Sequence, residues 1–152
     1  MKAAVYLRIA SVLTFVHAVL HTVGGVFGKV EPGPASVAAA AMQANQFLVL
    51  GAPRTYWMFL RGMGLAVTIF LTIEAVVFWQ LGTLTKTHGR GVRPMLMAFV
   101  VAYLAMAVNS YEYFFLAPVI TELLIAACLG MAFATVKETE ATEAGRAVGA
   151  LG

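Results

Sequence analysis

Charged side chains are scarce in this sequence. Only 11% of its 152 residues are Asp, Glu, Lys or Arg, whereas 61% are hydrophobic and the mean hydropathy is +0.87. A soluble domain of this size normally carries about 25% charged residues to cover its surface. The shortage therefore excludes an ordinary soluble domain and favours a chain that lies in a membrane.

The sequence also lacks the short motifs of several common functions. Its one cysteine, Cys128, cannot form a disulfide within the chain and says nothing about the redox compartment. Phosphate-binding glycine loops, nucleophile elbows and cysteine metal motifs are absent. The net charge of +3 does not indicate nucleic-acid binding, because the basic residues flank apolar runs instead of forming a patch.

Four apolar runs are long enough to cross a bilayer, since a spanning helix needs about 20 such residues. They cover residues 4–27, 55–84, 92–115 and 119–136, and together they make a single transmembrane domain, residues 1–136. Between the first two runs, residues 36–50 are alanine-rich but too short and too polar to span. We therefore predict an all-α integral membrane four-helix bundle with a short amphipathic interfacial helix at 36–50, followed by a polar C-terminal tail at 137–152.

Lysine and arginine are distributed unequally between the two ends of these runs. One side carries Lys2, Arg8, Lys86, Arg90, Arg93, Lys137 and Arg146; the other carries Lys29, Arg54 and Arg61. Cytoplasmic flanks of spanning helices carry the excess of Lys and Arg. The distribution places both termini in the cytoplasm.

Several polar side chains lie inside the predicted spans, where charge is costly and each such group needs a partner or a use. At 1.5 Å per residue, His21 lies roughly 27 Å, Asn109 roughly 25 Å and Glu112 roughly 30 Å from the cytoplasmic ends of their helices. Arg61 and Glu122 lie at a similar depth, each on a stripe of small residues. Asn109 and Glu112 continue a similar stripe, which we expect to pack against the other helices and which consists of Ala98, Ala102 and Ala105. We expect these groups to meet in an outward-facing polar cluster.

Three interpretations of this cluster remain open. In the first, it is a pocket for a small lipophilic or amphiphilic molecule, with His17 deeper in it, Arg54 and Arg61 near the head group and Tyr56 at an aromatic rim. A histidine and a carboxylate within reach of each other would also allow acid–base chemistry. In the second, the cluster is a structural network of ion pairs in a non-catalytic accessory subunit, which binds partner subunits or a second copy of the chain.

The third interpretation is a metal or haem site. His17 and His21 have the i, i+4 spacing at which one helix presents two imidazoles to one ion. The zinc-protease glutamate does not lie between them, and no second histidine pair is present to hold haem. We therefore favour no metal and predict no cofactor.

Glu74 lies on a different face of its helix from Arg61 and closer to the cytoplasmic side. Arg8 is the nearest basic residue in depth. Because charges buried in a membrane usually pair, we predict a structural ion pair between Arg8 and Glu74, with a proton or cation site at Glu74 as the alternative.

Parts of the sequence are similar to a known family. The segments are His21-Thr22-Val23-Gly24, Arg54-x-Tyr56-x-x-Phe59-x-x-Gly62-x-Gly64-Leu65, Trp79-Gln80-Leu81 and Tyr113-Phe114-Phe115-x-x-Pro118. They resemble a family of small bacterial four-span membrane proteins of unknown function and, more distantly, DoxX-like proteins. The resemblance implies a bacterial cytoplasmic (inner) membrane and a four-span fold, and it implies no reaction. It adds weight to His21, Arg54 and Tyr56, whereas His17 and Glu122 lie outside these segments.

Overall fold

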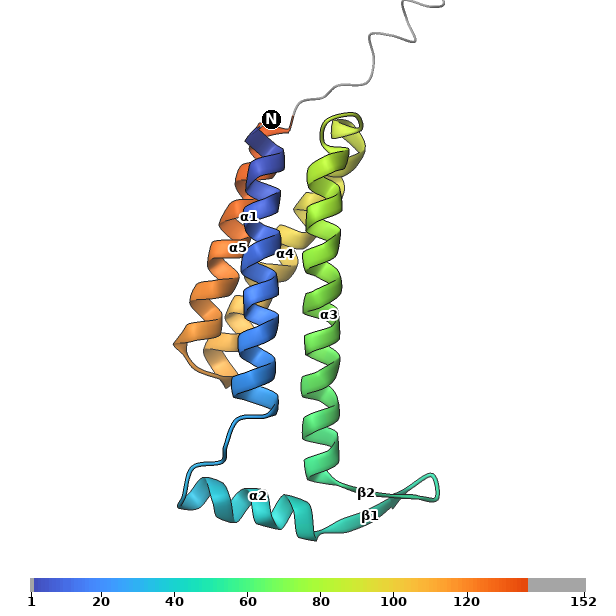
Figure 1. The fold of residues 1–152 in the computed structure, drawn as a ribbon, viewed down its shortest axis with the longest axis vertical. Coiled ribbons are helices and arrows are strands. Elements are labelled where there is room, and N and C mark those ends of the chain that lie inside the picture. Colours follow the sequence, from blue (N-terminus) through green and yellow to red (C-terminus); the bar gives the residue numbers. More distant parts are fainter. Residues whose placement is uncertain (1, 137–152) are drawn as a thin grey trace, which may run out of the picture. The chain divides into compact units, whose positions relative to one another are not determined.

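The computed structural model describes residues 2–136 of the chain; the predicted polar tail lies outside the described residues. The chain divides into two compact units. We call Met1–Phe15 with Ile73–Gly152 the core unit and Val16–Thr72 the hairpin unit. Two helices, α1 (Lys2–Leu20) and α3 (Tyr56–Leu84), are labelled in Figure 1. Each is divided between the units, with one part in the core unit and the other in the hairpin unit.

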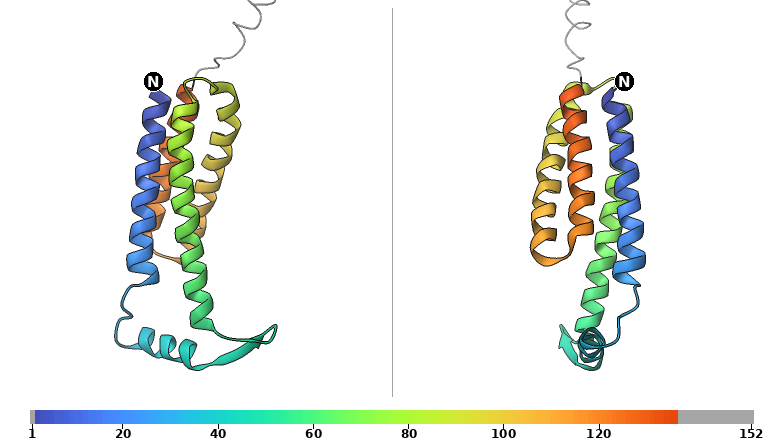
Figure 2. Two further views of the ribbon diagram at one scale, coloured as in Figure 1. Left: turned by 45° about the vertical axis from the view of Figure 1, so that its right-hand side comes forward. Right: turned by 90° about the vertical axis from the view of Figure 1, so that its left-hand side faces the viewer.

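The core unit consists of four helical segments around one set of buried side chains. They are the first part of α1, the last part of α3, α4 (Gly89–Tyr113) and α5 (Leu116–Thr135), and α4 and α5 lie side by side (Figure 2). The buried cluster comprises Leu7, Ala10, Phe78, Leu81, Val92, Leu96, Tyr103, Ile125, Ala126, Leu129 and Ala132. Close approach of α1 and α3 depends on Gly82, where a Cβ would lie 3.3 Å from the carbonyl oxygen of Ala4.

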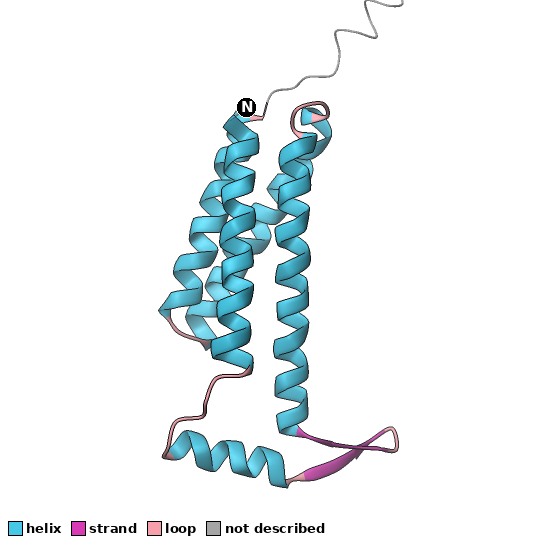
Figure 3. Ribbon diagram, viewed as in Figure 1, coloured by secondary structure: helices cyan, strands magenta, loops and turns pink. Residues whose placement is uncertain are grey.

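The hairpin unit begins with the last part of α1, which is followed by a single π-helical turn, η1 (His21–Val26). Helix α2 (Pro34–Ala44) follows; proline suits its first position, because the missing N–H would have no helical partner there. Strands β1 (Gln46–Val49) and β2 (Ala52–Thr55) then pair antiparallel and lead into α3 (Figure 3).

The turn of this hairpin contains two residues, Leu50 and Gly51, and both have positive φ, at 50° and 82°. Two-residue hairpin turns of this kind match the twist of the flanking strands, although leucine is an unusual residue there. Phe47 of β1 contacts the rings of Tyr56 and Phe59, with centroids 4.7 and 6.0 Å away. This aromatic contact ties the hairpin to the start of α3.

Within residues 2–136, four helical stretches are long and apolar enough to cross a membrane: Lys2–Val26, Tyr56–Leu84, Gly89–Tyr113 and Leu116–Thr135. The predicted class, a mostly helical protein with four spanning helices, is confirmed, and the chain is an integral membrane protein. A short helix between the first two spans is also found, but it ends at Ala44. Residues 46–55 form the hairpin instead, because the apolar, partly β-branched run 47–49 is followed by a glycine turn that allows two strands to pair.

Candidate functional site

The predicted site residues are divided between the two units. His17, His21, Arg54, Tyr56 and Arg61 belong to the hairpin unit, and Asn109, Glu112 and Glu122 belong to the core unit.

His21 connects η1, which continues α1, to α3 within the hairpin unit. Its Nε2 lies 3.0 Å from the carbonyl oxygen of Gly64 on α3. A carbonyl oxygen can only accept, so Nε2 carries a hydrogen and donates it. Nδ1 has no hydrogen-bond partner among the described residues. His21 also opens the π-helical turn, a feature that occurs often at functional sites.

Threonine side chains continue the polar contact between these two segments. Thr22 donates to the carbonyl oxygen of Ala18 at 2.6 Å, and its Oγ1 lies 2.9 Å from that of Thr68. Thr68 in turn donates to the Gly64 carbonyl oxygen at 3.2 Å. That single carbonyl therefore accepts hydrogen bonds from both helices, which fixes the position of the His21 ring.

Two glycines leave room for this arrangement. A Cβ at Gly64 would lie 2.8 Å from Cγ2 of Val26, closer than real side chains approach. A Cβ at Gly25 would lie 3.4 Å from Nδ1 of His21, whereas one at the neighbouring Gly24 would meet nothing within 4 Å. Gly64 thus permits the helix contact, and Gly25 leaves the free nitrogen of His21 uncovered.

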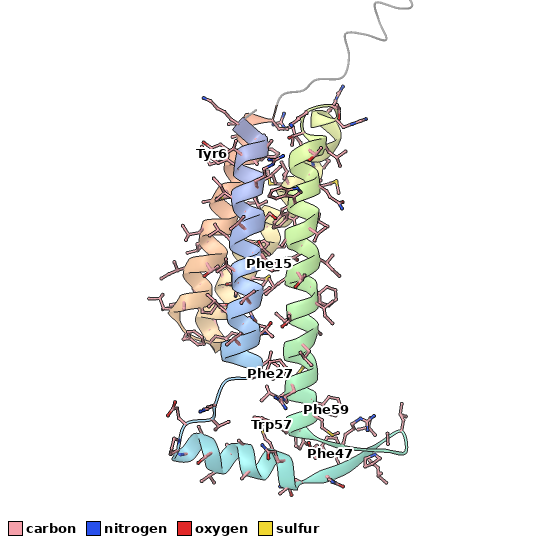
Figure 4. The ribbon with its side chains drawn as sticks, in the orientation of Figure 1. Tyr6, Phe15, Phe27, Phe47, Trp57 and Phe59 are labelled. Carbon is pink, nitrogen blue, oxygen red and sulfur yellow. The ribbon has the colours of Figure 1, made fainter. Side chains whose placement is uncertain are left out.

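The Arg61 guanidinium lies among aromatic rings. Its Cζ is 5.0 Å from the ring centroid of Phe27 and 6.0 Å from that of Trp57. Figure 4 labels these two residues, Phe27 directly after η1 and Trp57 in the first turn of α3. No carboxylate contacts Arg61 among the described residues, and Glu31 is the only acidic residue in the sequence of this unit. The positive charge is stabilised by cation–π contacts and is not neutralised by a neighbouring carboxylate.

The other three predicted residues of this unit have separate surroundings. Nδ1 of His17 is buried and has no hydrogen-bond partner within residues 2–136. Arg54 donates to the carbonyl oxygen of its neighbour Pro53 at 2.7 Å, and Tyr56 packs on Phe47. Arg54 and Tyr56 therefore lie at the base of the hairpin.

Among the described residues of the core unit, Glu122 is the one buried acidic side chain, with only 2% of its surface exposed. Its Oε1 accepts a hydrogen bond of 2.9 Å from Ser110 of α4, while Oε2 is buried without a partner among the residues described. Asn109 and Glu112 are exposed. The alanines predicted to pack on the same stripe of α4 (Ala98, Ala102 and Ala105) are exposed as well, and the buried face of α4 carries Leu96, Tyr103, Ala107 and Ser110 instead.

Arg8 and Glu74 have partners other than those expected. The Glu74 carboxylate accepts a hydrogen bond of 2.7 Å from the hydroxyl of Tyr103, which also lies 3.4 Å from Oγ1 of Thr14. The Arg8 guanidinium lies 4.7 Å from the ring centroid of Trp79. Neither side chain contacts the other within the part of the chain that the structure describes.

Comparison with known proteins adds no identity: no family model, no curated protein and no solved structure matches the chain. Within residues 2–136, no group of three or more His, Cys, Asp or Glu side chains is arranged to hold a metal ion.

Sequence reasoning missed Tyr103, the buried partner of Glu74. One signal for it existed, because a tyrosine inside a span needs a partner for its hydroxyl.

Proposed function

We propose that this membrane protein binds a small lipophilic or amphiphilic molecule at the hairpin unit, with its polar head near His21 and Arg61. The observation that supports this most is the pair of unsatisfied groups: Nδ1 of His21 without a hydrogen-bond partner and the Arg61 guanidinium without a carboxylate. The His21 ring is held at Gly64 of α3. Arg61 precedes Gly64 by three residues, so these two positions lie about 4.5 Å apart along the helix axis. An ionisable group inside a span indicates a functional site, and these two groups still offer hydrogen-bonding capacity that no described residue uses.

The chemistry of these groups defines the head group. With Nε2 donating to Gly64, a neutral His21 offers Nδ1 as an acceptor for a hydroxyl or an acid proton. The guanidinium offers several N–H donors to a carboxylate, phosphate or carbonyl oxygen. Acid–base chemistry would need a carboxylate beside the histidine, and Glu31 is the only acidic residue in the sequence of this unit. We therefore propose that this unit binds the molecule, without proposing a reaction. It does not depend on Asn109, Glu112 or Glu122.

Gly25→Leu should abolish ligand retention, because its side chain would cover Nδ1 of His21. Gly24→Leu is the matched control, since the same side chain there meets open space.

Arg61→Gln, which removes the charge, should reduce ligand retention at least tenfold, because it removes a charge-assisted hydrogen bond worth about 1.5–3 kcal/mol. Mass spectrometry of the small molecules extracted from equal amounts of each purified variant gives the comparison.

Two results would contradict the proposal. One is a wild-type extract that contains nothing beyond what empty micelles carry. The other is equal retention by Gly25→Leu and Gly24→Leu.

We further propose that the protein lies in a bacterial cytoplasmic (inner) membrane with both termini in the cytoplasm. The excess of Lys and Arg beside Lys2, Lys86 and Arg90 supports the orientation. The resemblance to small bacterial four-span proteins, and more distantly to DoxX-like proteins, supports the membrane.

This orientation predicts which engineered cysteines react from outside. In a Cys128→Ala background, Leu50→Cys at the exposed hairpin turn should be labelled by a membrane-impermeant maleimide in intact spheroplasts. His88→Cys, in the exposed loop between α3 and α4, should be labelled only after the membrane is opened. The reverse pattern would place the termini outside.

A second candidate function is that of a non-catalytic accessory or structural subunit. The exposed face of α4, with Ala98, Ala102 and Ala105 followed by Asn109, favours it. Small residues and a polar amide are what membrane helices use to pack against one another. A second chain that co-purifies in a fixed ratio, without any small molecule, would support this alternative.

A further inference from the structure

An open groove of about 380 Å³ runs along the core unit between α1 and α3. It is lined by Ser11, Val12, Phe15, Ala75, Val76, Trp79 and Gln80. The one hydroxyl in this lining, that of Ser11, is already used in a 2.6 Å hydrogen bond to the carbonyl oxygen of Ala75. Most of the groove therefore offers only an apolar surface, which suits a hydrocarbon chain.

One end of the groove is cationic. The Arg8 guanidinium lies over the ring of Trp79, and Arg8 has no acidic partner among the described residues. The neighbouring Gln80 is exposed, and its amide has no hydrogen-bond partner within residues 2–136. Arginine, an indole N–H and an amide together can donate several hydrogen bonds to a phosphate or an ester oxygen.

Among the described residues, the charged side chains at the helix ends beside Arg8 are also basic. Lys2 begins α1, Lys86 follows α3, and Arg90 lies in the first turn of α4, so the alternating helix directions bring all three to this end of the core unit. The nearest described carboxylate on α3, that of Glu74, lies five residues before Trp79, about 7.5 Å along the axis. It is hydrogen-bonded to Tyr103. This end of the unit therefore attracts anions.

We infer that the groove binds an anionic phospholipid, with its phosphate held by Arg8 and one acyl chain lying along Val12, Phe15 and Val76. The positive charge of Arg8 and of the basic residues nearby favours a lipid with a net negative charge over a zwitterionic lipid. The apolar walls of the groove accommodate its acyl chain. A basic side chain beside the phosphate contributes enough attraction to enrich an anionic lipid about fivefold, and Lys2, Lys86 and Arg90 contribute less because they do not line the groove and salt screens them. This site is separate from the proposed ligand site at His21 and does not depend on it.

Trp79 is a built-in reporter, because the chain contains only two tryptophans. Trp57→Phe leaves Trp79 as the single tryptophan, with 48% of its surface exposed. The protein is reconstituted in phosphatidylcholine vesicles that contain increasing fractions of either brominated phosphatidylglycerol or brominated phosphatidylcholine. Bromine quenches tryptophan fluorescence only at short range, so the quenching measures which lipid lies beside Trp79.

We expect brominated phosphatidylglycerol to be enriched beside Trp79 about fivefold over brominated phosphatidylcholine. Arg8→Gln should abolish this preference, and Arg8→Lys should retain most of it. Arg90→Gln, on an exposed basic residue outside the groove lining, should leave it nearly unchanged. Equal quenching by both lipids, or a preference that survives Arg8→Gln, would overturn the inference. A preference lost equally in Arg8→Gln and Arg90→Gln would show general surface attraction and would also overturn it.

Discussion

Replacing Tyr103 by alanine should lower the free energy of unfolding by about 3 kcal/mol. The Tyr103 side chain is fully buried in the core unit and lies against Phe78, with ring centroids 6.0 Å apart. In a membrane the unfolded helix stays in lipid, so little hydrophobic transfer energy is lost. What remains is the cavity left by the ring and a Glu74 carboxylate that loses its 2.7 Å hydrogen bond.

Two further variants separate these contributions. Tyr103→Phe keeps the ring and removes only the hydroxyl, and should cost about 1–2 kcal/mol. Tyr111→Ala is the matched control on the same helix, because that side chain is 74% exposed and its removal should cost less than about 0.5 kcal/mol. Thermal unfolding of the purified variants in one detergent gives the order. Equal stability of the Tyr103→Ala and Tyr111→Ala variants would show that the core unit is not packed around Tyr103.

Gly64→Leu should be the second severe change and should reduce stability by about 2–3 kcal/mol. Even a Cβ at this position would lie 2.8 Å from Val26, so the two helical segments of the hairpin unit would be forced apart. The Nε2 hydrogen bond of His21 to the Gly64 carbonyl oxygen would lengthen or break with them.

Gly62→Leu provides the control for this prediction. A Cβ at Gly62 meets nothing within 4 Å, and replacing a helical glycine by leucine adds helix propensity. Gly62→Leu should therefore be neutral or slightly stabilising. The melting temperatures of both variants are compared with that of the wild type, and a Gly64→Leu protein as stable as Gly62→Leu would refute the close contact.

The spans could be predicted from the sequence because the thickness of hydrocarbon sets the length of an apolar run. The helix faces were harder to predict. In a soluble helix the apolar face marks the core, but in lipid both faces are apolar, so periodicity does not distinguish inside from outside. For this reason the sequence predicts that Ala98, Ala102 and Ala105 of α4 pack inward, whereas the structure shows them exposed. Tyr103, which is fully buried in the core unit, is not identified from the sequence.

Depth alone also proved a weak guide to pairing. Arg8 and Glu74 were matched by depth, but Arg8 contacts Trp79, and the Glu74 carboxylate accepts a hydrogen bond from Tyr103. Depth gives one coordinate of a side chain, and the direction around the helix axis decides its neighbours. The hydrogen bond of His21 to a backbone carbonyl could not be predicted at all, because it depends on the π-helical turn and on how closely Gly64 approaches.

A crystal structure of the protein, purified in mild detergent with whatever it retains, tests the central proposal most directly. We expect non-protein density within hydrogen-bond distance of Nδ1 of His21 and of the Arg61 guanidinium. An acidic side chain within 4 Å of Arg61, together with a protein donor on Nδ1 and no intervening density, would contradict the proposed binding site.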